Sequence, residues 1–381
     1  MRSDTSANQS NELCFVGDLV SPAWAPLRFE RFRKWLGVRR LVANLEGAIL
    51  ADFKTATPRW TQKYSLASVR RLLTSLPDSA LLSVANNHVE DFLPQLRLPL
   101  APEKIIGAAG MKPRLLSAGN RRIALFAFAF PATDPARWRH HQLPLFLRPR
   151  AALRRLARIR AEYPSNHLVA YVHWGYEFSP IPYPADRAWA RRALEAGVDL
   201  IVGHHPHVLQ PVEKFGAGSV AYSLGNFYLP DGNFFGKDLV FPGSSACGMA
   251  LCYDGNTLTS HATVADFMNG DVTVLNGPGS DAKLPKAAFA GLTDRQYERF
   301  FREALETGGA RIPAGLPVIR DYAQAGAMSE MTLMLWQDSR QIARDVLIRA
   351  RLHNPYKEMA REYGRNTGRS EESTRAGLYE T

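Results

Sequence analysis

Short apolar runs recur along the chain, and a turn rich in Gly, Pro or polar residues follows each of them. The runs at 13–16, 41–43, 80–84, 121–130, 168–172, 200–202 and 220–222 are typical of buried strands. Between them, apolar residues at helical spacing predict helices near 27–36, 65–76, 149–163 and 186–196. Asp254-Gly255 separates two further strand candidates and predicts a hairpin. The alternation of strands and helices predicts an α/β fold.

Residue types that bind metals follow these apolar runs directly. His173 comes after the run at 168–172, and His205 and His207 come after the run at 200–202. The other strand-end polar residues are Asp18, Asn44, Glu46, Asn86, Asn87, His88, Asp91, Glu177 and Asn226. Because ligands collect where the strands of α/β sheets end, we expect these side chains to share one site. Imidazole is the commonest protein ligand for transition metals.

The residue types present match the needs of a two-metal hydrolytic site. Such a site needs a carboxylate that bridges both ions, further oxygen and nitrogen ligands, and a proton donor for the leaving group. Asp18 or Glu46 can bridge, and Asn87 offers a carbonyl oxygen. The alternative is that these residues are structural, with Asp18 and Glu46 capping helices and the histidines lying in turns or in the core.

Six motifs carry a family resemblance that covers roughly residues 12–265. They are Gly17-Asp18, NLE at 44–46, ANNHxxD at 85–91, HWGxE at 173–177, GHHPHVLQ at 203–210 and SLGNF at 223–227. In this order they closely resemble the CapA family of capsule and poly-γ-glutamate synthesis proteins, within the calcineurin-like metallophosphatase superfamily. The resemblance implies a four-layer αββα metallophosphatase-like sandwich with a dinuclear metal centre on loops at the strand ends.

The resemblance also implies a role for each strand-end residue. The metal ligands would be Asp18, Glu46, Asn87, His173, His205 and His207, with two divalent ions (Mn, Fe or Zn) as cofactors. Asp18 and His207 would hold the first ion, Glu46 would bridge, and the other ligands would hold the second. The catalytic residues would be His88 as general acid and Asp91 as the residue that orients it. Asn44, Asn86, Glu177 and Asn226 would orient the ligands, while His204 would not be a ligand.

Two positions depart from the family pattern. Val20 stands where phosphatases of the superfamily carry a histidine, so the first metal has one nitrogen ligand fewer. Leu93 replaces a glycine in the turn that presents His88. Both departures weaken the expectation of catalysis, and the first also predicts weaker binding of the first metal.

The charge of the chain points to an anionic partner. The formal net charge is +11, and Arg148, Arg150, Arg154, Arg155, Arg158 and Arg160 crowd one predicted helix without an acid among them. The basic face of this helix would attract an anionic substrate or an acidic polymer, or would dock on a membrane-associated synthesis complex. The plain alternative is a solvated helix face. Nucleic acid is the least favoured partner, because no nucleic-acid motif accompanies the charge.

The remaining features of the sequence predict the domain boundaries and the cellular compartment. We expect a flexible N-terminus at 1–11, a CapA-like domain at 12–268 and a helical C-terminal extension with a polar tail at 269–381. No apolar run is long enough to span a bilayer, and the N-terminus has no apolar segment typical of a secretory signal. Three cysteines give no disulfide framework. A cytoplasmic protein is the simplest interpretation.

Three functions compete at this stage. The first is a metal-dependent hydrolase of phosphoesters or related bonds, acting in capsule or poly-γ-glutamate-type polymer metabolism. The second is a non-catalytic accessory protein that binds an acidic polymer. The third is nucleic-acid binding through the arginine-rich helix.

Overall fold

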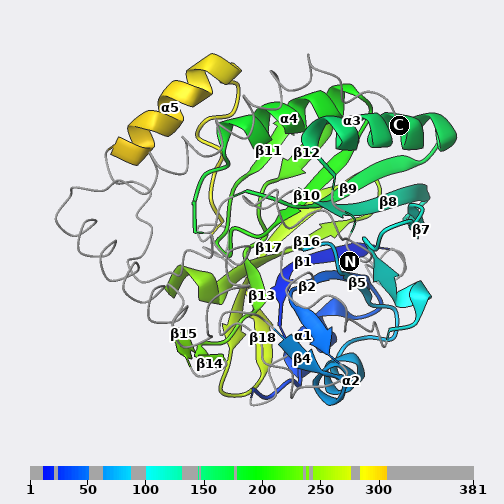
Figure 1. Cartoon of the computed structure of the whole chain (residues 1–381), viewed down its shortest axis with the longest axis vertical. Coiled ribbons are helices and arrows are strands. Elements are labelled where there is room, and N and C mark those ends of the chain that lie inside the picture. The colour runs from blue at the N-terminus through cyan, green and yellow to red at the C-terminus, as the bar shows by residue number, and fades with distance from the viewer. Residues whose placement is uncertain are drawn as a thin grey trace, which may run out of the picture.

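The computed structural model describes most of the first 306 residues of the 381-residue chain. The described residues are 12–20, 25–50, 63–86, 100–130, 145, 147–175, 178–234, 237–239, 243–275 and 284–306. Two large sheets lie face to face in this part of the chain, and helices cover their outer faces (Figure 1).

The first sheet has eight strands in the order β18-β17-β16-β1-β2-β5-β6, with β13 also paired to β1. β1, β2, β5, β6 and β13 run parallel, while β16, β17 and β18 extend the sheet in antiparallel fashion. The strands are β1 (Leu13–Leu19), β2 (Arg40–Leu45), β5 (Leu81–Ser83), β6 (Ile105–Ile106), β13 (Asn226–Tyr228), β16 (Cys247–Tyr253), β17 (Leu258–Asp266) and β18 (Asp271–Val274).

The second sheet has six strands in the order β11-β12-β10-β9-β8-β7. Its four central strands are parallel, and an antiparallel strand closes each edge. The strands are β7 (Arg114–Ala118), β8 (Arg121–Ala129), β9 (His167–His173), β10 (Leu200–His204), β11 (Val212–Phe215) and β12 (Gly218–Ala221). Two small ribbons are formed by β3 (Ala48–Leu50) with β4 (Lys63–Ser65), and by β14 (Gly232–Phe234) with β15 (Lys237–Leu239).

Three apolar cores separate the layers. Phe15, Leu125 and Tyr171 belong to the core between the two sheets. The outer face of the first sheet packs against α1 (Glu30–Leu36) and α2 (Leu66–Ser75). The outer face of the second sheet packs against α3 (Pro149–Glu162), α4 (Pro184–Glu195) and α5 (Asp294–Glu306). The four-layer α/β sandwich expected from the sequence is therefore confirmed. Short 3₁₀ turns occupy Pro102–Lys104 and Gly243–Ala246.

The segment from 284 to 306 completes the outer core of the second sheet. Phe289 and Tyr297 are buried in the same cluster as residues of α3 and α4. Arg187 of α4, fully buried, donates to both carboxylate oxygens of Glu213 on β11 and to the carbonyl of Leu292. A charged, doubly hydrogen-bonded pair of this kind is costly to break from one side. The domain boundaries expected from the sequence stay a prediction. Among the described residues, no helix combines the length and apolar character needed to cross a bilayer.

Candidate metal centre

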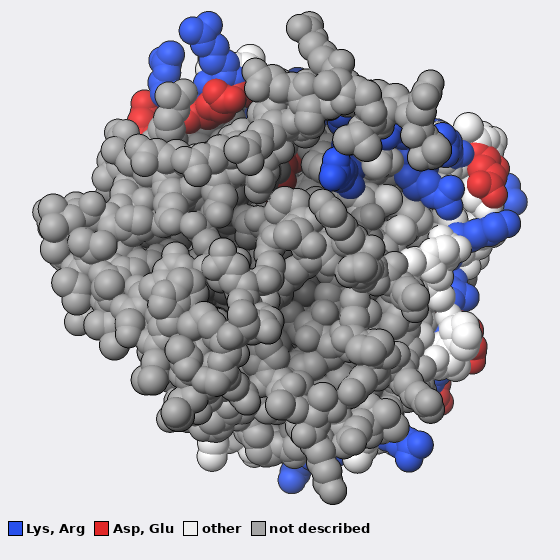
Figure 2. All heavy atoms as spheres, in the orientation of Figure 1, with Lys and Arg blue, Asp and Glu red and all other residues white. Residues whose placement is uncertain are grey.

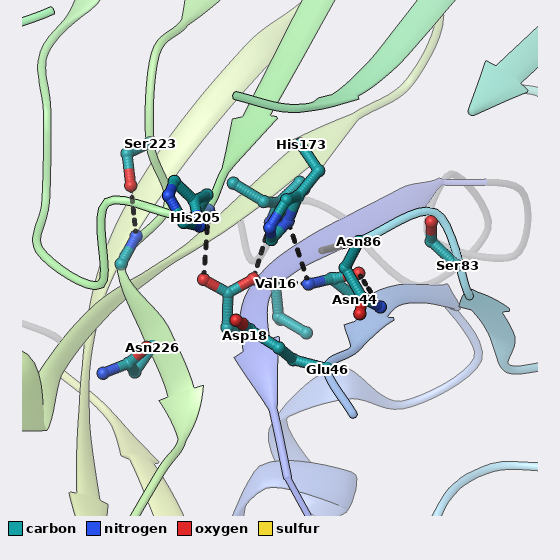
Figure 3. Close-up of polar contacts among 12 residues, drawn as sticks. Val16, Asp18, Asn44, Glu46, Ser83, Asn86, His173, His205, Ser223 and Asn226 are labelled. Atoms are coloured by element: carbon teal, nitrogen blue, oxygen red, sulfur yellow. Dashed lines mark hydrogen bonds and ion pairs between the residues drawn. The ribbon is translucent and has the colours of Figure 1, made fainter. Parts of the chain in front are cut away.

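Five of the six predicted ligands lie where strands of both sheets end. Asp18 lies near the end of β1, and Glu46 follows β2. His173 ends β9, and His205 and His207 lie just after β10. Figure 3 shows the carboxylates of the first sheet facing the imidazoles of the second. Because β1 runs parallel to β2 and β9 runs parallel to β10, each sheet delivers its polar side chains at one edge.

Gly17 explains how two distant motifs meet at this edge. A Cβ atom at position 17 would lie 2.0 Å from the carbonyl oxygen of Gly225, so no larger residue fits there. The close approach lets the backbone N–H of Asp18 donate to that same carbonyl at 3.0 Å. Asp18 then lies opposite Asn226 in the parallel pairing of β1 with β13. The Gly-Asp and SLGNF motifs thus contact each other directly through their backbones.

Asp18 is fully buried and held on both carboxylate oxygens. Asn44 donates to Oδ1 at 2.7 Å, and the backbone N–H of His205 donates to Oδ2 at 3.2 Å. His207 Nδ1 lies 3.4 Å from Oδ2. Asn86 fixes the orientation of Asn44, because its amide donates to the Asn44 side-chain oxygen at 3.4 Å and to the Leu45 carbonyl at 2.8 Å. The carboxylate therefore has one defined orientation.

Two ligand groups share the buried carboxylate of Glu46. Asp18, Glu46 and His207 each offer a ligand atom, and these atoms lie within 4.8 Å of one another. Glu46, His173 and His205 form a second group by the same measure. We call them the Asp18 group and the His173 group. One carboxylate common to two such groups is the arrangement that a bridged pair of metal ions requires.

Asn226 sets the tautomer of His207. Its amide nitrogen donates to the carbonyls of His207 and Ser245, at 3.4 and 3.1 Å, so its side-chain oxygen faces the imidazole. That oxygen lies 2.9 Å from His207 Nδ1, and this nitrogen therefore carries the proton. Nε2 is left with its lone pair, 3.4 Å from the Glu46 carboxylate. A lone pair at Nε2 is what a metal ligand needs.

The electrostatics of the site favour cations. Burial, together with the neighbouring Glu46, raises the pKa of Asp18 to about 7, while His207 and Asn44 act against the shift. Burial lowers the pKa of His173 well below its ordinary value, and His205 adds to the shift. Neutral imidazoles beside two crowded carboxylates are the protonation states in which histidine and acid bind divalent ions. The donor set thus fits a pair of such ions.

The backbone at the histidines is strained. His205 has φ of 97° and His207 has φ of 56°, both in the left-handed region that non-glycine residues seldom occupy. Each residue of this kind costs about 1–3 kcal/mol and is found mainly where function requires it. The strain turns both side chains from one short segment into the same site.

Several predicted site residues fall outside the described part of the chain. Asn87, His88, Asp91, Glu177 and Leu93 lie there, so their predicted roles stay predictions. Val20 is described and fully buried in the apolar core under the first sheet, and it offers the site no ligand atom. His204, which we did not expect to be a ligand, stacks on Tyr171 with ring centroids 4.1 Å apart. Burial lowers the pKa of His204 to about 3.

Known proteins are similar to this chain in the segment that contains the histidine motifs. The family model described as "Bacterial capsule synthesis protein PGA_cap" matches residues 106–231, which contain the HWGxE, GHHPHVLQ and SLGNF motifs. The Bacillus anthracis capsule biosynthesis protein CapA is 46% identical over 65 residues, 17% of this chain and 16% of that protein. Over these segments the chain is similar to the CapA family, in agreement with the resemblance seen in the sequence motifs.

Other similarities of this chain to known proteins are weaker. A Mycobacterium tuberculosis protein, named for an accessory role in polyglutamine synthesis, is 30% identical over 63 residues, 16% of this chain and 17% of that protein. The matched segments therefore span about a sixth of the length of these relatives. The NAD nucleotidase of Haemophilus influenzae superposes with a TM-score of 0.36 and 11% identity, over 80% of this chain and 69% of that one.

Proposed function

We propose that this chain is a CapA-like, metal-dependent hydrolase that acts on an anionic substrate in capsule or poly-γ-glutamate-type polymer metabolism. The observation that carries the proposal is the pair of ligand groups that share Glu46. Two divalent cations at such a site supply an activated water and stabilise the negative charge that develops during hydrolysis. Mn, Fe and Zn all suit this mixture of carboxylate and imidazole ligands.

The residues of the chain have distinct tasks in this scheme. Asp18 and His207 would hold one ion and His173 and His205 would hold the other, while Glu46 would belong to both ligand groups. Asn44 and Asn226 hold ligands in the binding orientation through the hydrogen bonds described above. By the family resemblance, His88 protonates the leaving group. The basic charge of the chain attracts an anionic substrate before it reaches the site.

Metal stoichiometry and turnover test the proposal together. The protein is stripped with a chelator and reloaded with Mn²⁺, Fe²⁺ or Zn²⁺, and bound metal is measured alongside hydrolysis of a generic phosphodiester and of poly-γ-glutamate. We expect two ions per chain and metal-dependent hydrolysis of at least one substrate. Glu46→Gln should lose both ions, while the exposed, matched change Glu195→Gln on α4 should lose neither. Binding of two ions without hydrolysis would refute the catalytic part alone.

A non-catalytic accessory role is the second candidate. The M. tuberculosis relative is named as a probable polyglutamine synthesis accessory protein. Val20 also leaves the Asp18 group without a further nitrogen ligand. In this case the loaded protein should bind poly-γ-glutamate and leave its length unchanged. Size-exclusion analysis of the polymer after prolonged incubation separates the two functions.

The arginine-rich helix gives partial support to an acidic-polymer partner. Lys and Arg side chains gather at the upper right of Figure 2, where Figure 1 places α3. Arg150, Arg154 and Arg158 are exposed on α3. Arg160 departs from the expected outer face, because it bonds to Asp199 at 2.5 Å and to the Gly197 carbonyl. The basic surface is thus narrower than the sequence indicates, and nothing in it favours nucleic acid over other polyanions.

A further inference from the structure

Cys14 and Cys252 lie directly opposite each other in the first sheet. β1 and β16 are antiparallel neighbours, and their register pairs these two residues. Both side chains belong to the core beneath α1 and α2. Opposed residues in an antiparallel pair have Cβ atoms about 4.5–5.5 Å apart, close to the separation that a disulfide spans. The register therefore places two thiols within bonding reach from positions far apart in the sequence.

The two thiols differ in their protonation. The hydrogen bond with Cys14 is the largest cause that lowers the pKa of Cys252 to about 6; burial acts against it, and a hydrogen bond with His261 acts with it. Burial raises the pKa of Cys14 well above its ordinary value, and the bond to Cys252 raises it further. At neutral pH the pair is thus a thiolate on Cys252 that accepts a hydrogen bond from the Cys14 thiol.

Three neighbouring elements supply the other charged groups around the pair. His261 lies on β17, opposite Ala250, so it shares a face of the sheet with Cys252. Its ring packs against Trp35 of α1 with centroids 5.2 Å apart. Arg39 lies over the same tryptophan at 5.2 Å and pairs with Glu12 at 2.5 Å. Arg39 and His261 both favour the thiolate on Cys252, and the carboxylate of Glu12 is paired with Arg39.

We propose that Cys14 and Cys252 are a redox-active dithiol that hydrogen peroxide converts into a disulfide between β1 and β16. Cys14 is fully buried and Cys252 is 3% exposed. A small oxidant such as hydrogen peroxide can therefore reach the sulfur atoms more easily than a bulky disulfide oxidant. This redox site is separate from the proposed hydrolytic function and does not rest on it. β1 also carries Asp18, so the new bond joins the strand that presents a metal ligand to its neighbour.

The chemistry balances in two steps. The Cys252 thiolate attacks one oxygen of hydrogen peroxide, the O–O bond breaks, and Cys252 becomes a sulfenic acid while hydroxide leaves and takes up a proton as water. The sulfur of Cys14 then attacks the sulfur of the sulfenic acid, its proton goes to the departing hydroxyl, and a second water leaves. Two thiols and one peroxide thus give one disulfide and two waters.

The test uses the full-length wild-type protein as purified. After timed exposure to hydrogen peroxide and quenching with catalase, free thiols are alkylated in denaturant and mapped by peptide mass spectrometry. We expect a disulfide-linked peptide pair containing Cys14 and Cys252, formed faster than any oxidation of Cys247. Cys247 is the internal control, because it lies on the same strand, is more exposed, and faces Val264 in the register.

The pH profile and one variant add independent readouts. Between pH 7 and 8.5 the oxidation rate of Cys252 should change by less than about twofold. An unfolded cysteine peptide with a pKa near 8.5 should instead react about 16-fold faster at the higher pH. Cys14→Ser should stop at a sulfenic acid on Cys252 that a carbon nucleophile traps. No Cys14–Cys252 disulfide in the wild-type protein, or oxidation of Cys247 at the same rate, would overturn the proposal whether or not the variant folds.

Discussion

Replacing Glu46 with glutamine should stabilise the metal-free protein and abolish its stabilisation by metal. Glu46 and Asp18 are both fully buried, and Glu46 is one of the causes that raise the pKa of Asp18 from 3.8 to about 7. That difference corresponds to about 4 kcal/mol of folding free energy. Burial causes the larger part, so removing the Glu46 charge should recover only some of it, on the order of 1–2 kcal/mol.

The pH range of the effect follows from the direction of the Asp18 shift. Below about pH 4 the carboxyl is protonated in both folded and unfolded protein, and the cost is absent. As the pH rises toward 7 the unfolded chain ionises freely while the folded one resists, so the metal-free protein loses stability over this range. The Glu46→Gln substitution lowers the pKa of Asp18 in the folded protein. The melting temperature of the variant should therefore fall less between pH 5 and 8 than that of the wild type.

Thermal unfolding with chelator and with Mn²⁺ or Zn²⁺, at pH 5 and 8, measures these effects. The control is Glu213→Gln, the same substitution at an equally buried carboxylate. Glu213 is paired with Arg187, so its neutralisation leaves a buried cation and should cost about 3–5 kcal/mol. The two variants should thus shift the metal-free melting temperature in opposite directions. A Glu46→Gln protein that melts below wild type at pH 8, or keeps the wild-type metal response, would refute the reasoning.

Three further predictions concern the ligands, the acid and the surface. His205→Ala should lose metal and turnover together, whereas His88→Ala should keep the metal and lose a factor of about 10²–10⁴ in rate; equal metal loss in both would remove His88 from its catalytic role. Because Val20 offers no ligand, calorimetric titration should show the His173 group binding more tightly than the Asp18 group, and two equal affinities would contradict this. The double substitution Arg154→Glu and Arg158→Glu should weaken binding to poly-γ-glutamate at low salt and leave the metal content unchanged. Unaltered binding would mean that the basic face of α3 is only solvated and binds no polymer.

Most of the fold and much of the candidate site could be predicted from local sequence patterns. Each strand-end ligand follows its own apolar run within a few residues, so its place at a sheet edge could be predicted without knowing the partner strands. The clear strand at 121–130 and the hairpin at Asp254-Gly255 were confirmed for the same reason. Strands with weak local patterning, such as β7, β11 and β18, could not be predicted, because neighbouring strands and not their own residues define them.

Contacts between segments far apart in the chain could not be predicted from the sequence. The approach of Gly17 to Gly225 and the pairing of Cys14 with Cys252 depend on which strands neighbour β1, and periodicity carries no such information. Arg160 shows the same limit for charge. Its position in an acid-free run predicts an exposed cation, but Asp199, distant in the sequence, turns it inward.

The stability of the metal-free fold gives an argument for metal binding that is independent of any relative. Two buried carboxylates repel each other, burial keeps the imidazole of His173 neutral, and His205 and His207 adopt strained backbone conformations, all at one edge of the two sheets. Each feature destabilises the protein without ions, and an apolar residue at any of these positions would cost less. Divalent cations would turn the repulsion into attraction and use the neutral imidazoles as ligands. The buried acid Glu213, by contrast, is paired with Arg187 through both carboxylate oxygens. The concentration of unfavourable terms around Asp18 and Glu46 therefore supports the proposed metal site.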